Sequence, residues 1–182
     1  LHALPPFASR EETLDGEDKW SCTQCVAGTG RKVVATKQAR IKQAPRILLL
    51  QLSRFQFSTA GVNAQKNRTH VEFPEERFLL PVFGQASGEG WGPKTDVPYQ
   101  LKAAVVHGNS SCNSAQGTLT GGHYWAYVRR GASWIKAEDA NVSPATTADL
   151  KKECVYLLVY EKKTRRQAKN FSTGQQKVIV FS

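Results

Sequence analysis

The chain has 182 residues, which is enough for one domain with a real core, or one domain plus appendages. It is 40% hydrophobic and 22% charged, as a globular protein usually is, and apolar runs such as "RILLLQL" are far too short to span a membrane. The start, "LHALPPFASREE", lacks the basic and apolar regions of a signal peptide. We therefore expect a cytoplasmic or nuclear protein without a membrane partner. Because the chain contains no methionine, we also expect it to be a piece of something longer.

The net charge of +10 raises the question of an anionic partner such as nucleic acid. The densest basic cluster is "EKKTRRQAKN" at 161–170, and no aromatic residue interleaves with it until Phe171. A stacking platform for bases is therefore not indicated. We expect 163–182 to be a solvated basic tail, and we do not expect nucleic acid to be the partner.

The first half of the chain is rich in strand signals. Residues 1–16 suggest a short helix or turn leading to a loop. The stretch "KWSCTQCVAGTGRKVVATKQARI" predicts a strand, a tight C-x-x-C turn and a returning strand. The run "RILLLQLSRFQF" is apolar on both faces before it alternates, which is typical of a strand entering the core of a sheet.

The second half continues in the same style. The segments "VEFP" and "FLLPVF" predict short strands interrupted by prolines, and "GQASGEGWGPKTDVP" predicts a surface loop. Four further strands are expected in "YQLKAAVVHGN", "HYWAYVRR", "SWIKAEDA" and "CVYLLVYEK". One short helix is expected in "SPATTADLKKE". The sequence thus predicts a mainly antiparallel β protein with little helix.

The stretch "GGHYWAYV" carries the best candidate for chemistry, His123. A hairpin through "RRGAS" would bring His123, at the start of one strand, to the same sheet edge as Glu138 and Asp139, at the end of the next. An acid can orient an imidazole for service to a nucleophile, and Gly122 would let an extended substrate approach closely. A structural, packed histidine is the commoner alternative on spacing alone.

Several stretches, in order across roughly residues 10–162, resemble the ubiquitin-specific proteases, the papain-like deubiquitinating enzymes. They are "LDGEDKWSCTQC", "ATKQARIKQAPRILLLQLSRFQF", "VEFPEERFLL", "YQLKAAVVHGN", "GGHYWAYV", "SWIKAEDANV" and "CVYLLVYEK". The resemblance covers the C-terminal half of that family's catalytic domain. It implies an α+β, mainly β fold of the papain-like cysteine peptidase superfamily, with an antiparallel twisted sheet, the palm, at 43–162 and a finger extension of strands near 18–42.

Site roles follow from the resemblance position by position. His123 is the general base, and Gly122, Tyr124 and His107 border the channel for the ubiquitin tail. The orienting residue, an Asp or Asn in the family, falls four positions after Trp134 on Glu138, one methylene longer. Asp139 follows directly, and we expect it to take the orienting role, with Glu138 as the second candidate.

The cysteines depart from the family pattern. The family's nucleophile lies near the N-terminus of its domain, and no such stretch exists in this chain. Cys112 and Cys154 lack the setting that lowers a thiol pKa, so we expect passive thiols. Cys22 and Cys25 resemble half of a zinc ribbon, or the remnant of one, because a structural site needs four ligands and the family's other pair lies upstream.

Two functions from different classes follow. In the first, the chain supplies the catalytic histidine and acid of a thiol protease, and an upstream half of the domain supplies the cysteine. The enzyme would hydrolyse the bond after the C-terminal glycine of ubiquitin, with no cofactor needed for the chemistry. In the second, the chain is a degenerate module that binds ubiquitin or another protein without cutting.

Overall fold

The computed structural model describes residues 2–3, 11–21, 31–56, 65–85, 91–108, 122–163 and 177–181. The chain divides into two compact units: residues 1–5, 44–80 and 96–182 form the first, and residues 6–43 and 81–95 form the second. The predicted finger near 18–42 falls within the second unit, and most of the predicted palm falls within the first.

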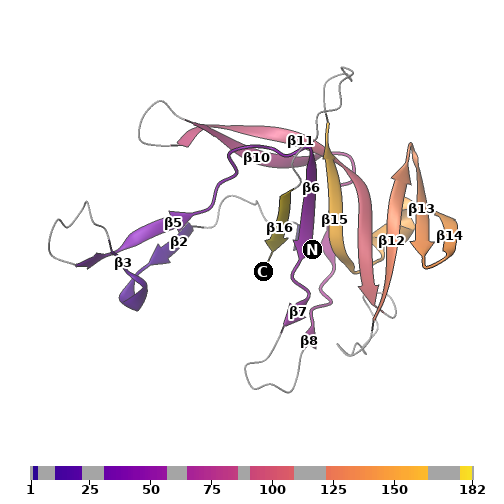
Figure 1. The fold of residues 1–182 in the computed structure, drawn as a ribbon, viewed down its shortest axis with the longest axis horizontal. Helices are drawn as coiled ribbons and strands as arrows, with labels where there is room; N and C mark the ends of the chain where they lie inside the picture. Colours follow the sequence, from indigo (N-terminus) through magenta and orange to yellow (C-terminus); the bar gives the residue numbers. More distant parts are fainter. Residues whose placement is uncertain are drawn as a thin grey trace. The chain divides into compact units, whose positions relative to one another are not determined.

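The larger unit holds most of one eight-stranded sheet (Figure 1), two strands of which also have residues, 81–85 and 91–95, in the second unit. Its path runs β14-β13-β12-β11-β15-β6-β16, and β10 pairs with β11. The strands are β6 (Ile47–Leu52), β10 (Phe78–Gln85), β11 (Trp91–Gly108), β12 (His123–Arg130), β13 (Ser133–Glu138), β14 (Asn141–Ala145), β15 (Val155–Lys162) and β16 (Lys177–Phe181). Among the registered pairs of this sheet, β16 and β6 run parallel and the others antiparallel, so the predicted mainly antiparallel β architecture is confirmed.

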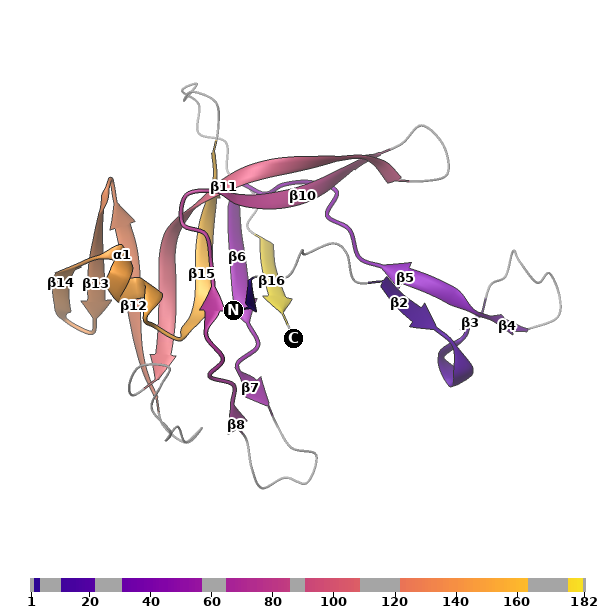
Figure 2. The same cartoon turned by 180° about the vertical axis from the view of Figure 1, so that it is seen from behind.

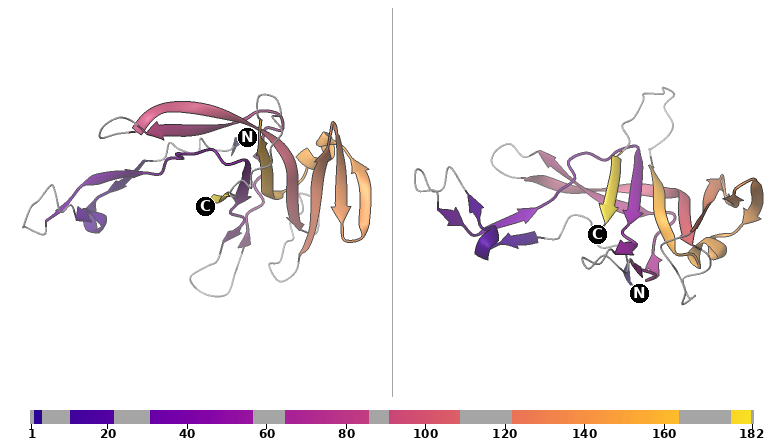
Figure 3. Two further views of the ribbon diagram at one scale, coloured as in Figure 1. Left: turned by 45° about the horizontal axis from the view of Figure 1, so that its top comes forward. Right: turned by 60° about the horizontal axis from the view of Figure 1, so that its bottom comes forward.

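The smaller elements of the first unit are two short strand pairs and a helix. β1 (His2–Ala3) pairs in parallel with β9 (Val71–Glu72), and β7 (Phe55–Gln56) pairs with β8 (Gln65–Lys66). Figure 3 shows β7 and β8 continuing beyond the end of β6. The helix α1 (Thr147–Lys151) lies at the β12–β13 end of the sheet (Figure 2).

Besides its parts of β10 and β11, the second unit contains two antiparallel pairs among its described residues. β2 (Glu11–Leu14) pairs with β5 (Ala35–Gln38), and β3 (Trp20–Ser21) pairs with β4 (Lys32–Val33). A single 3₁₀ turn, η1, covers Gly16–Asp18. The helix or turn expected near the N-terminus is therefore corrected at 11–14, where the residues form a strand because they pair with β5.

The core of the first unit follows from the alternation of β6. Leu48, Leu50 and Leu52 are buried while their neighbours are half-buried, as expected for a strand inside a sheet. Two tyrosines complete the core, and each hydroxyl donates to a proline carbonyl: Tyr99 to Pro45 at 2.5 Å and Tyr160 to Pro74 at 2.8 Å. Such bonds satisfy the polar end of an otherwise apolar buried side chain.

The predicted helix is present but shorter than its sequence pattern. Ser143 and Pro144 belong to β14, and the N-cap is Thr146, which forms a capping box with Asp149. The buried Leu150 anchors the helix to the core. A helix of one and a half turns depends on such caps and packing, because propensity alone does not stabilise it.

Two further expectations need correction. The expected surface loop at 84–98 is strand at 84–85, which belong to β10, and at 91–98, which belong to β11. Within the expected basic tail, residues 177–181 form β16 beside β6, a strand that the sequence analysis did not foresee. Among the described residues, no helix has the length and apolar character needed to span a membrane.

Candidate active site

His123 lies at the start of β12, where two carboxylates meet its imidazole. Its Nε2 atom is 3.2 Å from Oε1 of Glu138 and 3.5 Å from Oδ2 of Asp139. The predicted hairpin produces this meeting, because Arg130 pairs with Ser133 across Gly131, a glycine with φ of +61° that suits the tight turn. The three side chains are accessible, at 42%, 37% and 76% exposure for His123, Glu138 and Asp139.

Asp139 occupies a backbone conformation that is unusual for its residue type. It lies in the two-residue turn between β13 and β14, where Glu138 pairs with Asn141, and its φ is +52°. Residues other than glycine rarely adopt this region, although aspartate tolerates it better than most. A costly conformation is retained where the surrounding structure holds it, and here it directs the carboxylate to His123.

Lys136 holds the other oxygen of Glu138. Its Nζ atom is 2.7 Å from Oε2, and the same ammonium lies 5.0 Å from the centre of the Trp125 ring. The hydrogen bond from Lys136 lowers the pKa of the Glu138 carboxyl, and the nearby His123 acts in the same direction. Glu138 therefore stays ionised and is held between a lysine and the histidine.

The three predicted substrate residues also meet. Gly108 pairs with His123 and His107 with Tyr124 across β11 and β12. The rings of His107 and Tyr124 are 4.5 Å apart. Gly122 is essential to this packing, since a Cβ atom there would lie 1.9 Å from Nε2 of His107. We call the surface formed by His107, Gly122 and Tyr124 the corner. Tyr124 is 52% exposed and His107 only 9% exposed, so one side of the corner is open and the other is buried.

Sequence reasoning missed Glu153, which bonds two aromatic side chains of β12, the strand that begins with His123. Oε1 of Glu153 accepts hydrogen bonds from Trp125 Nε1 at 3.2 Å and from the Tyr127 hydroxyl at 2.8 Å. Desolvation, followed by the Glu153 contact, raises the pKa of Tyr127. Glu153 is 26 residues from Tyr127, so no local pattern announces the contact.

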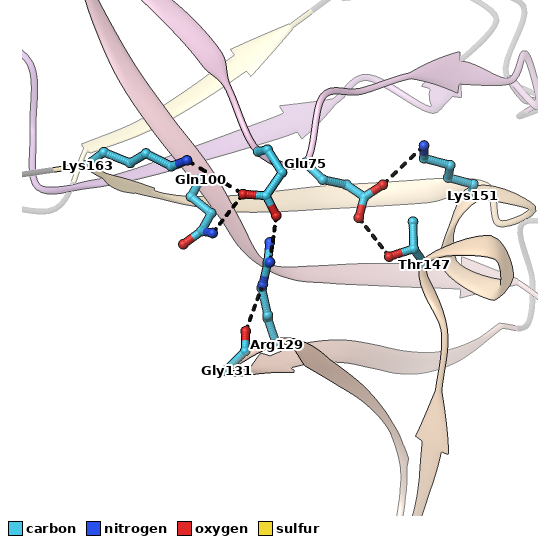
Figure 4. Close-up of polar contacts among 8 residues, drawn as sticks. Glu75, Gln100, Arg129, Gly131, Thr147, Lys151 and Lys163 are labelled. Atoms are coloured by element: carbon cyan, nitrogen blue, oxygen red, sulfur yellow. Dashed lines mark hydrogen bonds and ion pairs between the residues drawn. The ribbon is translucent and has the colours of Figure 1, made fainter.

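A pair of adjacent glutamates ties the sheet and helix together (Figure 4). Oε1 of Glu76 is 2.5 Å from Nη2 of Arg129 on β12, and Gln100 donates to Oε2 of Glu76 at 3.0 Å. Glu75 pairs with Lys151 of α1 at 3.1 Å and accepts from Thr147 at 2.8 Å. The strand that begins with His123 is thus fixed at its other end.

Arg54, in the stretch "RILLLQLSRFQF" quoted above, is buried with 3% exposure. Its Nε donates to the Val155 carbonyl at 3.0 Å and its Nη1 donates to the carbonyls of Asn67 and Thr69. It bonds main-chain carbonyls at the start of β15 and between β8 and β9, a structural role that the sequence did not reveal.

The cysteines contribute no nucleophile within the described residues. Cys154 is 6% exposed and disulfide-bonded, so the expectation of a free thiol is wrong there. Cys22, Cys25 and Cys112 lie outside the described residues. In the part of the chain that the structure describes, no group of three or more His, Cys, Asp or Glu side chains could hold a metal ion.

Comparison with known proteins identifies the family. A family model described as ubiquitin carboxyl-terminal hydrolase matches residues 13–160. The chain belongs to this family. It is 33% identical over 156 residues to ubiquitin carboxyl-terminal hydrolase 17-like protein D of Mus musculus, with 85% of the chain and 25% of the relative covered. It is 34% identical over 155 residues to ubiquitin carboxyl-terminal hydrolase 2 of Gallus gallus, with 84% and 38% covered.

Solved structures agree with this membership. The SAGA Ubp8/Sgf11/Sus1/Sgf73 DUB module bound to ubiquitin aldehyde matches with a TM-score of 0.65 and 26% identity, covering 86% of this chain and 32% of that one. This match confirms the predicted papain-like fold class. The chain spans a quarter to about two fifths of the curated relatives quoted above, so it corresponds to part of the family domain.

Proposed function

We propose that this chain supplies the base and acid of a deubiquitinating thiol protease. The observation that carries the proposal is the contact of His123 Nε2 with two carboxylates, in a chain that belongs to the ubiquitin carboxyl-terminal hydrolase family. A carboxylate on one imidazole nitrogen fixes the ring and leaves the other nitrogen to serve a nucleophile. Within the described residues, Nδ1 of His123 has no hydrogen-bond partner, as that role requires.

The chemistry assigned to His123 is two proton transfers in each direction, one pair for each half of the reaction. Nδ1 removes the proton of a cysteine thiol, and the thiolate attacks the carbonyl of ubiquitin's terminal glycine. The imidazolium then gives its proton to the leaving amine, and an acyl-enzyme remains. Water, deprotonated by the same imidazole, then attacks the thioester and breaks its C–S bond. Ubiquitin is released with a free carboxylate, and the imidazolium returns its proton to the departing thiolate.

We assign the main orienting role to Glu138, with Asp139 in support. The shorter distance to Nε2 and the ion pair with Lys136 support Glu138, since a side chain held at both oxygens keeps its orientation. The expectation from the sequence favoured Asp139, whose 76% exposure leaves it more freely hydrated. The extra methylene of glutamate is accommodated because Lys136 fixes its far oxygen.

The proposed partners are ubiquitin or ubiquitinated proteins and an upstream half of the domain that bears the nucleophile. The DUB module quoted above was solved with ubiquitin aldehyde, and this likeness supports ubiquitin as the partner. Gly122, Tyr124 and His107 would border the path of the ubiquitin tail. Cys22 and Cys25 would contribute half of a structural zinc site, and the cytoplasm or nucleus is the proposed location.

Two observations favour a second function. The single cysteine among the described residues, Cys154, is disulfide-bonded and buried. By the sequence resemblance, Glu138 also stands where the family has an Asp or Asn. A module that binds ubiquitin without cutting it would have no use for a nucleophile. This alternative keeps the corner formed by His107, Gly122 and Tyr124 and gives up the reaction.

The test is labelling by ubiquitin that carries a thiol-reactive group at its C-terminus. The probe is applied to the 182-residue chain and to the chain extended upstream in its natural gene. We expect labelling of the extended form and its loss in His123→Ala. Binding of plain ubiquitin without any labelling would replace the protease by the binding module. Absence of both would overturn the proposed function.

A further inference from the structure

Lys66 of β8 contacts two acceptor positions of His107 at once. Its Nζ atom lies 3.2 Å from Nδ1 of the ring and also donates to the His107 carbonyl oxygen. An ammonium has donors and no acceptor, so the ring nitrogen facing it must offer a lone pair. Nδ1 of His107 is therefore unprotonated, and a neutral ring in this state carries its proton on Nε2.

We propose that Lys66 is a positioning residue that holds His107 as the Nε2–H tautomer, which makes this N–H a fixed hydrogen-bond donor for a carbonyl of the ubiquitin tail. The substrate part of this inference rests on the proposed function. The tautomer part rests on the geometry of Lys66 and His107 alone.

The ring of His107 is held in one orientation by aromatic neighbours. Its centroid is 5.4 Å from that of Phe55 in an edge-on arrangement and 4.5 Å from that of Tyr124. The register between β11 and β15 also shifts between Val105 and Val106, immediately before His107, and such irregularities re-aim the following side chain. A donor on a ring so confined points in a defined direction.

Gly122 determines what Nε2 faces. A Cβ atom on Gly122 would lie 1.9 Å from Nε2, so only a glycine leaves space beside this nitrogen, and Gly122 is itself exposed. In the described part of the chain, Nε2 has no acceptor. This N–H has a fixed direction and lies beside Gly122, the residue before His123. It is therefore placed to donate a hydrogen bond to an extended peptide backbone.

Burial and the charge of Lys66 both favour the neutral form of His107. Burial lowers the pKa of His107, and the charge of Lys66 lowers it further. The Lys66 ammonium is itself desolvated and faces Arg68 and Arg54, which lower its pKa. No carboxylate is within ion-pair distance of His107 among the described residues, whereas His123 faces two. His107 thus faces a cation and His123 faces two carboxylates. These surroundings suit His107 to donate a hydrogen bond and His123 to exchange protons.

The tautomer is tested by long-range ¹H–¹⁵N correlation spectra of the 182-residue chain at neutral pH. His107 signals are identified by their loss in His107→Gln. We expect an unprotonated Nδ1 and a protonated Nε2 in the unsubstituted chain. In Lys66→Met the two tautomers should mix, and Lys66→Arg, which also only donates, should restore the single form. A protonated Nδ1 in the unsubstituted chain, or no change in Lys66→Met, would overturn the inference.

The substrate part is tested by titrating the same variants with ubiquitin and with ubiquitin that lacks its C-terminal glycines. We expect Lys66→Met to weaken binding of intact ubiquitin severalfold and to leave binding of the trimmed form unchanged, with Lys66→Arg close to the unsubstituted chain. Equal losses for both ubiquitins would mean general disruption and would overturn the role of the donor. If the tautomer is fixed but the chain binds neither intact nor trimmed ubiquitin, the proposed function is refuted. The tautomer assignment is then still correct.

Discussion

Lys136 and Glu138 form an ion pair of 2.7 Å on β13, and this pair leaves the second oxygen of Glu138 directed at His123. Residues two apart on a strand face the same side, so the lysine and glutamate reach each other without a backbone distortion. The indole of Trp125 lies under the ammonium at 5.0 Å and restricts where it can go. The orientation of the catalytic candidate therefore depends on a residue that never touches it.

Replacing Lys136 with methionine should raise the pKa of the Glu138 carboxyl toward its ordinary value of 4.5, because the hydrogen bond from Lys136 is the largest cause that lowers it. A lowered carboxyl pKa stabilises the fold above the ordinary value, and this contribution is lost as pH falls through the lowered one. The unsubstituted chain should therefore lose more free energy of unfolding below about pH 4.5 than Lys136→Met. Carbon-detected NMR titration of Glu138 and urea unfolding at several pH values measure both effects. Lys136→Arg serves as the control, and an unchanged Glu138 titration in Lys136→Met would refute the coupling.

The two acids should differ in their effect on reaction rate. Glu138→Gln keeps the size of the side chain and removes the charge next to Nε2, and we expect labelling of the extended form to slow by about tenfold or more, since an oriented imidazole is worth orders of magnitude. Asp139→Asn should slow it less, and the double variant should exceed either. Stopped-flow or gel-based labelling rates decide the order. A larger loss in Asp139→Asn would return the main role to Asp139.

The backbone at Asp139 offers a separate test. Its φ of +52° suits glycine better than alanine, and a left-handed conformation costs a non-glycine residue about 1–2 kcal/mol. Asp139→Gly and Asp139→Ala remove the same carboxylate. The glycine variant should unfold at higher urea concentration than the alanine variant, by a free energy of about 1 kcal/mol. Equal midpoints would show that the turn does not require the left-handed conformation.

Gly122 should tolerate no side chain. In Gly122→Ala the Cβ atom would meet the ring of His107 at 1.9 Å, so the ring or the backbone must move. We expect loss of the close packing of His107 on Tyr124, and ubiquitin binding weakened by at least tenfold as the corner opens. Gly131→Ala is the matched control, because the space around it is open and only its φ of +61° opposes the change. Near-normal ubiquitin binding by Gly122→Ala would contradict the packing that the structure shows.

Glu153 should matter to stability rather than to chemistry. Glu153→Ala removes the acceptor of two largely buried donors, Trp125 Nε1 and the Tyr127 hydroxyl, and an unpartnered buried donor costs about 1–3 kcal/mol. Glu153→Gln retains an acceptor oxygen and should cost less. Thermal or urea unfolding measures the free energy, with tryptophan fluorescence as the probe. A destabilisation equal in the two variants would indicate lost charge rather than a lost acceptor.

Much of the β12–β13 region is readable from the sequence because its contacts are local. A hairpin of regular alternation with a two-residue turn has one natural register, and that register brings His123 to the acids. The strand at 91–98 was not readable, because glycine and proline there mimic a loop while pairing partners elsewhere hold the chain extended. Strand β16 was not predicted for a similar reason. A short apolar run after a basic segment is recognisable as a strand only from its pairing with β6.

The supporting contacts were hidden by distance along the chain. Lys66 is 41 residues from His107, and Arg54 is 101 residues from Val155. A lysine in a loop-like stretch or an arginine before an aromatic residue is normally solvated. Nothing in a single sequence marks Lys66 as half-buried or Arg54 as buried. Only the fold shows that these cations form hydrogen bonds with main-chain carbonyls and with an imidazole.

The difference in sequence separation has a consequence for how the site assembles. His123, Lys136 and Asp139 belong to one hairpin and the turn that follows it, so their arrangement involves only short loop closures and should appear early in folding and survive partial denaturation. The contact of Lys66 with His107 closes a much longer loop and waits for β8 to meet β11. His123 would therefore be in place beside its acids before Lys66 fixes His107.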